Sequence, residues 1–507
     1  MNIKQAKQEI TNTLKAYLAK DQLGNYLIPT VRQRPVLLMG PPGVGKTQIM
    51  EQIAAETGVG LVAYTITHHT RQSAIGLPFI EKRTYGGEEV SVTEYAMSEI
   101  LSSVYRLMER TGLQEGILFL DEINCVSETL APMMLQFLQC KTFGNQALPE
   151  GWLIVAAGNP PEYNKSVRDF DVVTLDRVKR IDVEEDYGVW KEYARRKNLH
   201  GAIRSYLDIK KDNFYRIENT ADGLQFATAR GWEDLSELLY AYETLGIRAD
   251  REVVGQYIQM PRIAKDFANY LEMFYKYQKT YHVEGILSGT WENITVLELR
   301  EAPFDEKLSV MGLVLSRLSE EARNTRCQDA LTDALHTSLT EFREKIADAP
   351  PLTVLDQLLW KRRTAMKQAK EAGQLDKESR DLKQREINAL EDYRQQLDRE
   401  AVAPEGAMDA VRGWFGEEVE RRKAVAMETK DMFDNAFRFL ETTFGDSQEL
   451  VIFVTEITAG YDTSWFVEQF GCDAYFRHNR ELLFDSTRHR IREEIAAAKA
   501  AEQEENT

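Results

Sequence analysis

Eight consecutive residues near the N-terminus combine the features that hold the phosphates of a nucleotide. They read "GPPGVGKT" and fit the spacing G-x-x-x-x-G-K-S/T. In such a loop the glycines allow a tight turn that points backbone N–H groups at the phosphates, and the lysine reaches the β- and γ-phosphates. We therefore expect the whole segment to bind the phosphate chain: Gly40, Pro41, Pro42, Gly43, Val44, Gly45, Lys46 and Thr47.

The segments on both sides of this loop fit the same interpretation. An apolar run at residues 36–39 predicts a buried strand, and residues 47–56 predict a helix with Ile49, Met50 and Ile53 on one side. The N-terminus of that helix would add partial positive charge to the phosphate site. The alternative is a chance glycine turn between a strand and a helix, and the two fitting flanks argue against it.

Two carboxylates follow a second apolar run, at residues 117–120, and their expected roles differ. Asp121, at the end of the predicted strand, would hold Mg²⁺ through its water shell, and the Thr47 hydroxyl would also bind the ion. Glu122 would orient and deprotonate the attacking water. The structural alternative is a solvated acidic pair at a strand end.

A third apolar run, at residues 152–157, is followed by Gly158 and Asn159. An amide at the carboxyl end of a strand can hydrogen-bond both the γ-phosphate and the attacking water, because ligands collect at that edge of parallel sheets. Taken alone, the tripeptide "GNP" is a common turn. Its position one helix beyond Glu122 is what makes Asn159 a candidate catalytic residue.

Length, charge and cysteine content narrow the class of protein. The chain has 507 residues, 43% of them hydrophobic, and a formal net charge of −18. This charge argues against a general nucleic-acid or anionic-membrane surface, although a local basic channel stays possible. The four cysteines show no C-x-x-C spacing, there is no signal-peptide pattern, and no apolar run is long enough to span a membrane. We expect reduced thiols and a cytoplasmic location.

Five segments occur in the order seen in AAA+ ATPases: "GPPGVGKT", "LFLDEIN", "AAGNP", "LDRVKRI" and "TARGWEDL". They specifically resemble the MoxR branch, over about residues 30–245. The resemblance implies an α/β fold, the AAA+ P-loop NTPase core with a parallel doubly wound sheet, followed by a helical lid. Beyond the resemblance, amphipathic patterns predict a mostly α-helical C-terminal extension. It also implies Mg²⁺-dependent ATP hydrolysis in a ring, commonly a homo-hexamer, with ATP at each subunit boundary.

The resemblance assigns roles to arginines outside the phosphate loop. Arg177, in "LDRV", matches the arginine finger that reaches into the neighbour's site and stabilises charge in the transition state. Relatives usually have Phe after it, whereas this chain has Val178, so Arg180 competes for the role. Arg230 matches the lid arginine that senses the γ-phosphate, although relatives often carry Pro where this chain has Ala229. The alternative for each is a surface arginine paired with a carboxylate.

Two hairpins are expected beside the core. Residues 79–85 and 88–92 flank a pair of glycines, which predicts a hairpin, and the resemblance implies that it points toward the pore of the ring. The segment "KTFGNQALPEGW" is the candidate for a second, shorter hairpin near the pore. Aromatic residues that only cover the sheet edge are the alternative. The candidate contacts with a substrate are Phe79, Tyr85 and Phe143.

Three regions follow from these patterns. Residues 1–185 would form the α/β ATPase core with its hairpin insertions, and 186–282 would form the helical lid. Residues 283–507 would form a helical C-terminal region. Within it, the densely charged segment at about 360–400 predicts a solvated helix or helical hairpin, with a docking arm as the alternative.

Two kinds of function remain open from the sequence. The first is chaperone-like remodelling or activation of a protein partner, because MoxR relatives commonly act with proteins that contain a von Willebrand factor A (VWA) domain. No D-x-S-x-S motif occurs here, so such a partner would be a separate chain. The second is a nucleic-acid-associated AAA+ motor, which the acidic residues beside Lys82 and Arg83 disfavour. A scaffold that binds nucleotide without hydrolysis is a third reading, and Glu122 argues against it.

Overall fold

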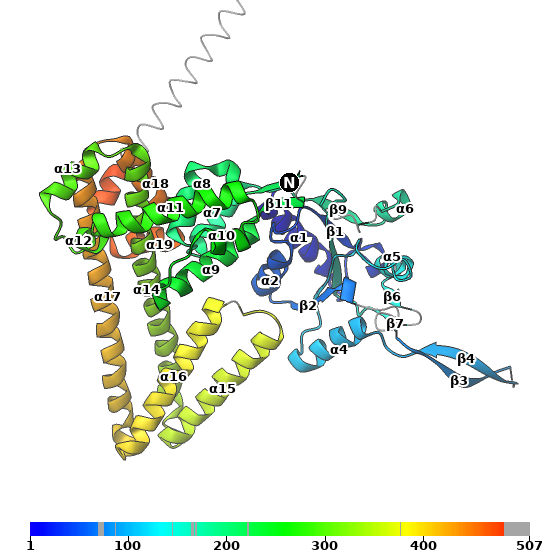
Figure 1. Ribbon diagram of the computed structural model, residues 1–507. Helices are drawn as coiled ribbons and strands as arrows, with labels where there is room; N and C mark the ends of the chain where they lie inside the picture. The colour runs from blue at the N-terminus through cyan, green and yellow to red at the C-terminus, as the bar shows by residue number, and fades with distance from the viewer. Residues whose placement is uncertain are drawn as a thin grey trace, which may run out of the picture. The chain divides into compact units, whose positions relative to one another are not determined.

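A computed structural model describes residues 1–68, 76–86, 88–143, 146–163, 167, 170–220, 223–375 and 377–480 (Figure 1). The chain divides into two compact units, each made of separate stretches of sequence. The first unit contains Met1–Val189, Thr228–Arg230 and Leu355–Glu391, and the second contains Trp190–Ala227, Gly231–Val354 and the chain from Asp392 onward. The predicted division at residues 185 and 282 stays a prediction.

A five-stranded sheet forms the centre of the first unit, and every neighbouring pair of its strands is parallel. The central strands read as continuous apolar runs because both faces of a parallel sheet are covered by helices. The spatial order is β2 (Gly60–Thr65), β5 (Gly116–Asp121), β8 (Trp152–Gly158), β1 (Val36–Met39) and β9 (Lys179–Asp182). The predicted α/β core with a parallel, doubly wound sheet is confirmed.

Helices pack on both faces of this sheet, and the alternation along β1 decides which side chains meet which helices. Val36 and Leu38 pack in one cluster with α1 (Ile3–Leu18) and α2 (Lys46–Thr57). Leu37 and Met39 pack in a second cluster with the helices of the opposite face. Those helices are α4 (Glu99–Thr111) and α5 (Ala131–Cys140). Shorter helical segments of this unit are η1 (Thr30–Arg32), η2 (Ile66–His68) and α6 (Val172–Leu175).

Both predicted hairpins are present. Strands β3 (Pro78–Tyr85) and β4 (Glu88–Tyr95) pair antiparallel, and all eight residues of β3 are exposed. Figure 1 shows this hairpin extending away from the sheet and its helices. Strands β6 (Thr142–Phe143) and β7 (Gln146–Ala147) form the shorter hairpin. Gly87, Gly144 and Asn145 lie outside the described residues.

The charged segment forms a two-helix hairpin, as one of the sequence alternatives predicted. Its helices are α15 (Pro351–Glu371) and α16 (Lys377–Arg399), and Arg362 and Arg363 of the first pair with Glu386 and Glu391 of the second. The turn between them contacts the edge of the α/β core. There Glu371 lies 3.3 Å from Arg110, and the Gln374 amide donates to the backbone oxygen that precedes β2.

The second unit is almost wholly helical, but it includes a hairpin that the helical periodicity did not predict. The hairpin pairs β10 (Arg216–Thr220) with β11 (Gly223–Ala227), and the two residues of its turn lie outside the described ones. Alternating side chains on these strands give a period of two, which the surrounding helical pattern obscures. The neighbouring helical segments are α7 (Tyr187–Arg196), α8 (Gly201–Ile209), η3 (Lys211–Asn213), α9 (Ala229–Leu245), α10 (Arg251–Tyr257) and α11 (Pro261–Thr280).

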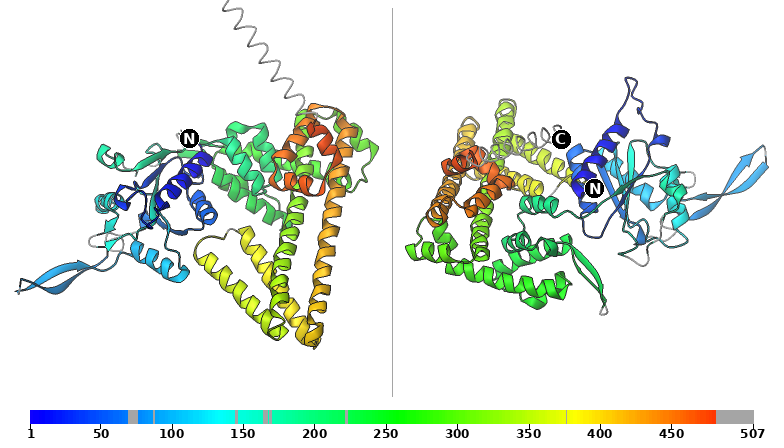
Figure 2. Two further views of the ribbon diagram at one scale, coloured as in Figure 1. Left: turned by 180° about the vertical axis from the view of Figure 1, so that it is seen from behind. Right: turned by 90° about the horizontal axis from the view of Figure 1, so that it is seen from above.

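Two long helices organise the C-terminal part of this unit, and they lie side by side in Figure 1 and in the left view of Figure 2. They are α14 (Phe304–Lys345) and α17 (Ala407–Phe444). Shorter helical segments pack near one end or connect the elements: α12 (Val283–Leu287), α13 (Asn293–Glu301), η4 (Pro404–Gly406), α18 (Gln448–Ala459) and α19 (Tyr461–Phe470). The predicted helical C-terminal region is therefore confirmed. In the described part of the chain, no helix is long and apolar enough to cross a membrane.

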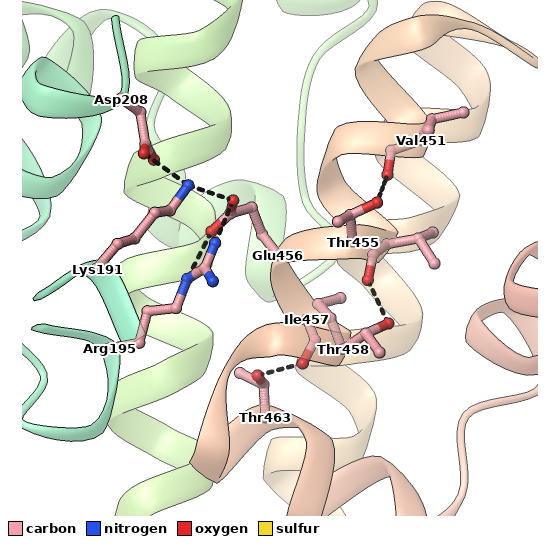
Figure 3. Close-up of polar contacts among 10 residues, drawn as sticks. Lys191, Arg195, Asp208, Val451, Thr455, Glu456, Ile457, Thr458 and Thr463 are labelled. Carbon is pink, nitrogen blue, oxygen red and sulfur yellow. Dashed lines mark hydrogen bonds and ion pairs between the residues drawn. The ribbon is translucent and has the colours of Figure 1, made fainter. Parts of the chain in front are cut away.

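An ion-pair cluster ties α7 and α8 to α18 within the second unit (Figure 3). Glu456 accepts from Arg195 at 2.5 and 3.1 Å and from Lys191 at 2.9 Å. Lys191 also lies 2.6 Å from Asp208 on α8. Burial raises the pKa of the Glu456 carboxyl, but the two cations outweigh burial and hold that pKa below its ordinary value.

Candidate nucleotide site

The backbone of the loop between β1 and α2 depends on its glycines. Gly43 and Gly45 adopt positive φ angles of 76° and 93°, a region that favours glycine. A Cβ at Gly40 would lie 2.8 Å from the backbone oxygen of Val183, so a side chain does not fit there. Gly45 is the N-cap of α2, and no side chain caps its N–H groups. An uncapped helix N-terminus beside a glycine loop fits an anion.

Lys46 is buried, with 8% of its surface exposed, and its hydrogen-bond partners are neutral oxygens. Its Nζ donates to the backbone oxygens of Gly40 and Pro41 at 2.8 and 2.9 Å and to Oδ1 of Asn159 at 2.8 Å. Burial lowers the pKa of the ammonium to about 8 against the opposing effect of Asp121, and nearby Arg230 lowers it further. A buried cation bonded only to neutral groups fits a phosphate ligand.

The oxygens expected to hold a metal ion meet at the carboxyl end of β5. The Thr47 hydroxyl donates to Oδ2 of Asp121 at 3.1 Å, and the other Asp121 oxygen accepts from the backbone N–H of Glu122 at 2.9 Å. Over the described ranges, no group of three or more His, Cys, Asp and Glu side chains could hold a metal ion by itself. This donor set fits Mg²⁺ arriving with the phosphates, because that ion keeps waters and takes few protein ligands.

Glu122 is held from the neighbouring strand. Its backbone adopts a positive φ of 56°, which is uncommon for a residue with a side chain. The hydroxyl of Thr67, just beyond β2, donates to Oε2 of Glu122 at 2.8 Å. The carboxylate is therefore oriented by a neutral donor and remains half-exposed to solvent.

Asn159 connects β8 to both neighbouring elements. Its side chain accepts from Lys46, and its backbone oxygen accepts from Nδ2 of Asn124 at 2.7 Å. Asn124 is buried and lies close to Gly158. A Cβ added at Gly158 would be 2.6 Å from Oδ1 of Asn124. The glycine before Asn159 thus makes room for the side chain that fixes this strand end.

Arg230 also lies at the loop, within the same compact unit. A Cβ added at Gly43 would be 3.3 Å from the Thr228 side chain and 3.5 Å from the Cβ of Arg230. Arg230 is the second residue of α9, as the sequence pattern predicted, and its side chain is exposed. The structure therefore brings the predicted lid arginine next to the glycines of the phosphate loop.

Arg177 lies at the opposite edge of the sheet from the loop. It precedes β9, which runs parallel to β1 with Lys179 level with Val36. The phosphate loop follows β1, so Arg177 is at the amino edge and the loop is at the carboxyl edge. Arg177 is exposed and donates to neutral Gln139 at 2.8 Å. Arg180 instead lies within β9 and pairs with Asp182 on its own strand at 2.8 Å.

The predicted substrate contacts separate into two groups. Phe79 and Tyr85 are exposed on β3. Phe143 is only 2% exposed and stacks on Phe137, with ring centroids 4.0 Å apart. The prediction was wrong for Phe143, because its ring completes the core below α5 and leaves no surface for a substrate.

Several side chains of the site were not assigned from the sequence. Thr67 could have been noticed because it comes shortly after β2, at the edge of the sheet where ligands collect. Asn124 stands inside the quoted segment "LFLDEIN", but its spacing alone does not indicate a bond to Asn159. Thr228 comes close to Gly43 only through tertiary folding, and no local pattern marks it.

Comparison with known family models agrees with this fold. Residues 35–178 match the family model described as AAA domain (dynein-related subfamily). The matched segment begins before β1 and ends before β9, so it contains the loop, both carboxylates and Asn159. The chain therefore carries an AAA domain, which belongs to the class of nucleotide-binding ATPase domains.

Two solved structures are similar over part of their length. One is a presumed ATPase from Cytophaga hutchinsonii, with 18% identity and a TM-score of 0.24 over 38% of this chain and 56% of that one. The other is a RuvB mutant from Thermotoga maritima, with 16% identity and a TM-score of 0.27 over 51% of this chain and 69% of that one. The chain thus spans little more than half of the first. A search among curated proteins found no match.

Proposed function

We propose that the chain is a Mg²⁺-dependent ATPase of the MoxR type that works as a ring and remodels a protein partner. The observation that supports hydrolysis is the single hydrogen-bonded arrangement around Lys46, which joins the phosphate loop to Asn159. Two carboxylates end the strand beside it. A loop that only binds nucleotide has no need of the second carboxylate.

Each side chain has a distinct role in this proposal. Lys46 and the N-terminus of α2 bind the phosphates, while Thr47 and Asp121 hold the magnesium ion that arrives with ATP and neutralises phosphate charge. Glu122 takes the proton of the attacking water, and the Thr67 hydroxyl orients its carboxylate. Asn159 orients that water and the terminal phosphate through its amide.

Arg177 acts on the neighbouring subunit in this proposal. Because it lies at the sheet edge opposite its own phosphate loop, it has no route to its own nucleotide. Among the described residues its hydrogen-bond partner is the neutral amide of Gln139, and an exposed guanidinium with such a partner can reach another site at low cost. The Arg180–Asp182 pair leaves Arg180 less suited to this task. The finger therefore supports a ring, which we propose to be a homo-hexamer.

A protein client fits the exposed hairpin better than a nucleic acid does. Lys82 pairs with Glu89 at 3.2 Å, and Arg83 pairs with Glu81 and Glu94 at 2.9 and 3.2 Å. These carboxylates neutralise the cations that a nucleic-acid motor would use to bind phosphates. Phe79 and Tyr85 remain as exposed aromatic contacts for a polypeptide. We propose that this partner is a separate VWA-domain protein or its client, and that the ring works in the cytoplasm.

A pull-down with the Glu122→Gln chain tests this function. The variant should bind ATP without turning it over and so keep the client bound, and captured proteins would be identified by mass spectrometry before and after nuclease treatment. The matched control is Lys46→Ala, which should hold neither ATP nor client. A protein retained after nuclease only by Glu122→Gln supports remodelling. Nucleic acid, or proteins lost with nuclease, would contradict it and favour the motor.

A further inference from the structure

A basic pocket lies in the second compact unit, and its lining shares no residue with the phosphate loop. Its volume is about 750 Å³, and it is formed by the end of α8, η3, the start of β10 and the first turns of α11. This size falls within the range of small-ligand sites, roughly 300–1,000 Å³. Five of its lining residues are cations: Lys210, Lys211, Arg216, Arg262 and Lys265.

The charge of this pocket is opposite to that of the chain. Its five cations exceed its two lining carboxylates, Asp212 and Asp266, by three, and Glu218 just outside the lining offsets one of these charges by pairing with Arg216, whereas the whole chain carries −18. Gathering like charges around a cavity costs free energy unless an anion binds there. The local sign therefore indicates an anionic ligand.

Some of the cations already have partners, and others do not. Lys210 pairs with Asp266 at 2.5 Å, and Arg216 pairs with Glu218 at 2.5 Å. In the described part of the chain, the side chains of Lys211 and Lys265 make no hydrogen bond or ion pair. Both are exposed, and they approach the cavity from η3 and from α11 respectively. They can bind a ligand without breaking an existing contact.

The wall behind these cations is held rigid by a chain of hydrogen bonds. Buried Asn213 donates to the Tyr206 hydroxyl at 2.7 Å, which donates to Asp266 at 2.7 Å. Lys210 donates to the same Asp266 oxygen. This network occupies one carboxylate of the pocket, so its repulsion of an anion is reduced. The site is therefore organised before a ligand binds.

The first turn of α11 adds to the positive field. It contains no acidic residue, its N-cap Met260 makes no side-chain cap, and Arg262 and Lys265 lie one turn apart on it. Cations are unfavourable at a helix N-terminus, where carboxylates are normally preferred. A bound anionic ligand would supply the negative charge that carboxylates normally provide at a helix N-terminus, and so would explain the cations found here.

We propose that this pocket binds a small ligand with a chain of two or three phosphate groups, at a site separate from the phosphate loop. Several closely spaced negative charges match the cluster of cations that line the pocket, Lys211 and Lys265 above all, which a single carboxylate would not. A nucleic acid or an acidic peptide would need basic surface that continues beyond the cavity, and the acidic composition of the chain disfavours that. The site would let a phosphate compound regulate the protein without entering the ATP site.

Titration of inorganic triphosphate into the full chain tests this proposal. The chain would carry Lys46→Ala, so that the phosphate loop does not contribute, and calorimetry would be done in EDTA to avoid metal chelation. We expect saturable binding to this chain. Because the loop is disabled, the result is independent of whether the protein hydrolyses ATP.

Two double variants in that background provide the comparison. Lys211→Gln with Lys265→Gln should weaken triphosphate binding by at least about tenfold. Lys276→Gln with Lys279→Gln removes the same charge from the exposed far end of α11. This pair should change the affinity for triphosphate by less than about twofold. Absence of saturable binding, or equal losses in both pairs, would overturn the proposal. Tighter binding of poly-glutamate or single-stranded DNA than of triphosphate would also overturn it.

Discussion

Thr67 and Asn124 hold two candidate catalytic residues from neighbouring elements. Thr67 donates to the Glu122 carboxylate, and Asn124 donates to the backbone of Asn159. Neither would touch ATP in the proposed mechanism, so both are positioning residues. Their substitution should change turnover more than nucleotide affinity.

Thr67→Val should lower kcat by about tenfold with little change in KM, because Glu122 loses the donor that orients it. Thr67→Ser keeps the hydroxyl and should restore most of the activity. Steady-state ATPase assays of both variants check this. An unchanged kcat in Thr67→Val, or failure of the serine variant to recover, would show that the hydroxyl does not position the base.

Asn159→Ala should lower kcat by roughly a hundredfold, the cost typical of one lost polar group at a reacting centre. Nucleotide affinity should change far less, because Lys46 keeps the backbone oxygens of Gly40 and Pro41 as partners. Asn124→Ala is the matched comparison. It should lower kcat less than Asn159→Ala does, because it removes only the hydrogen bond that holds the backbone of Asn159. ADP binding and single-turnover kinetics would separate the two effects. Equal losses in affinity and turnover would assign Asn159 a binding role.

The candidate site residues that could be predicted from the sequence are those that belong to a short motif. The phosphate loop, Asp121 and Glu122 follow from spacing, and the strand ends place Asn159 beside them. Thr67 and Thr228 could not be assigned in that way, because they meet the loop and Glu122 only after the strands and the lid segment come together. Phe143 was misassigned because an aromatic in a hairpin looks the same in sequence whether it is exposed or packed.

The α15–α16 hairpin contacts the core through few groups. The exposed Arg110–Glu371 pair contributes about 0–1 kcal/mol, while Ala372 beside it is buried. Ala372→Arg should therefore free the turn and speed amide exchange in β2, the edge strand, with little change in Tm. Gln368→Arg, an exposed position on α15, is the control. Equal exchange in the two variants would show that the turn does not protect that edge.

The ion pairs of Glu456 should stabilise the second unit. Glu456→Gln leaves Lys191 and Arg195 without their shared carboxylate, so the free energy of unfolding should fall by about 1–3 kcal/mol near neutral pH. Glu468→Gln removes an exposed carboxylate from α19 and should have little effect. Denaturant unfolding at pH 7 compares the two. Equal stability of the Glu456 and Glu468 variants would contradict the role of the cluster.

The same interaction has a defined dependence on pH. The folded-state pKa of Glu456 is lowered, so its contribution is present above the ordinary glutamate pKa and is lost as pH falls through the folded value. The difference between wild type and Glu456→Gln should shrink in acid and stay constant from about pH 6 to 8. A difference that grew as the pH fell would contradict the lowered pKa.

Elements with one strong period were predicted well, and those that depend on tertiary contacts were not. The three apolar runs predicted the core strands β1, β5 and β8, and the glycine pair predicted the β3–β4 hairpin. The β10–β11 hairpin was missed because short strands with only one fully buried residue carry a weak alternating signal among amphipathic helices. The α15–α16 turn docks through the backbone oxygen of Val59, which accepts from Gln374, and through the buried side chain of Ala372. Neither contact leaves a pattern in the sequence.

At the scale of the whole molecule, the central claim is that one chain is incomplete as a catalyst. The residues around Lys46 lie at the carboxyl edge of the sheet, and Arg177 lies at the amino edge. Under the proposed function, a subunit would hold ATP with its own loop and would need a neighbour's Arg177 to stabilise the transition state. Coupling between neighbours follows, because turnover at each boundary depends on how two subunits meet.

Mixing two inactive variants tests this claim most directly. Arg177→Ala chains keep a complete Glu122 site, and Glu122→Gln chains keep the finger, so each should be inactive alone. Mixed rings should regain ATPase activity wherever an intact finger meets an intact base, with a maximum near equal proportions. Arg180→Ala in place of Arg177→Ala should retain activity by itself. No recovery at any ratio, in mixtures shown to assemble together, would contradict a finger that acts across the subunit boundary.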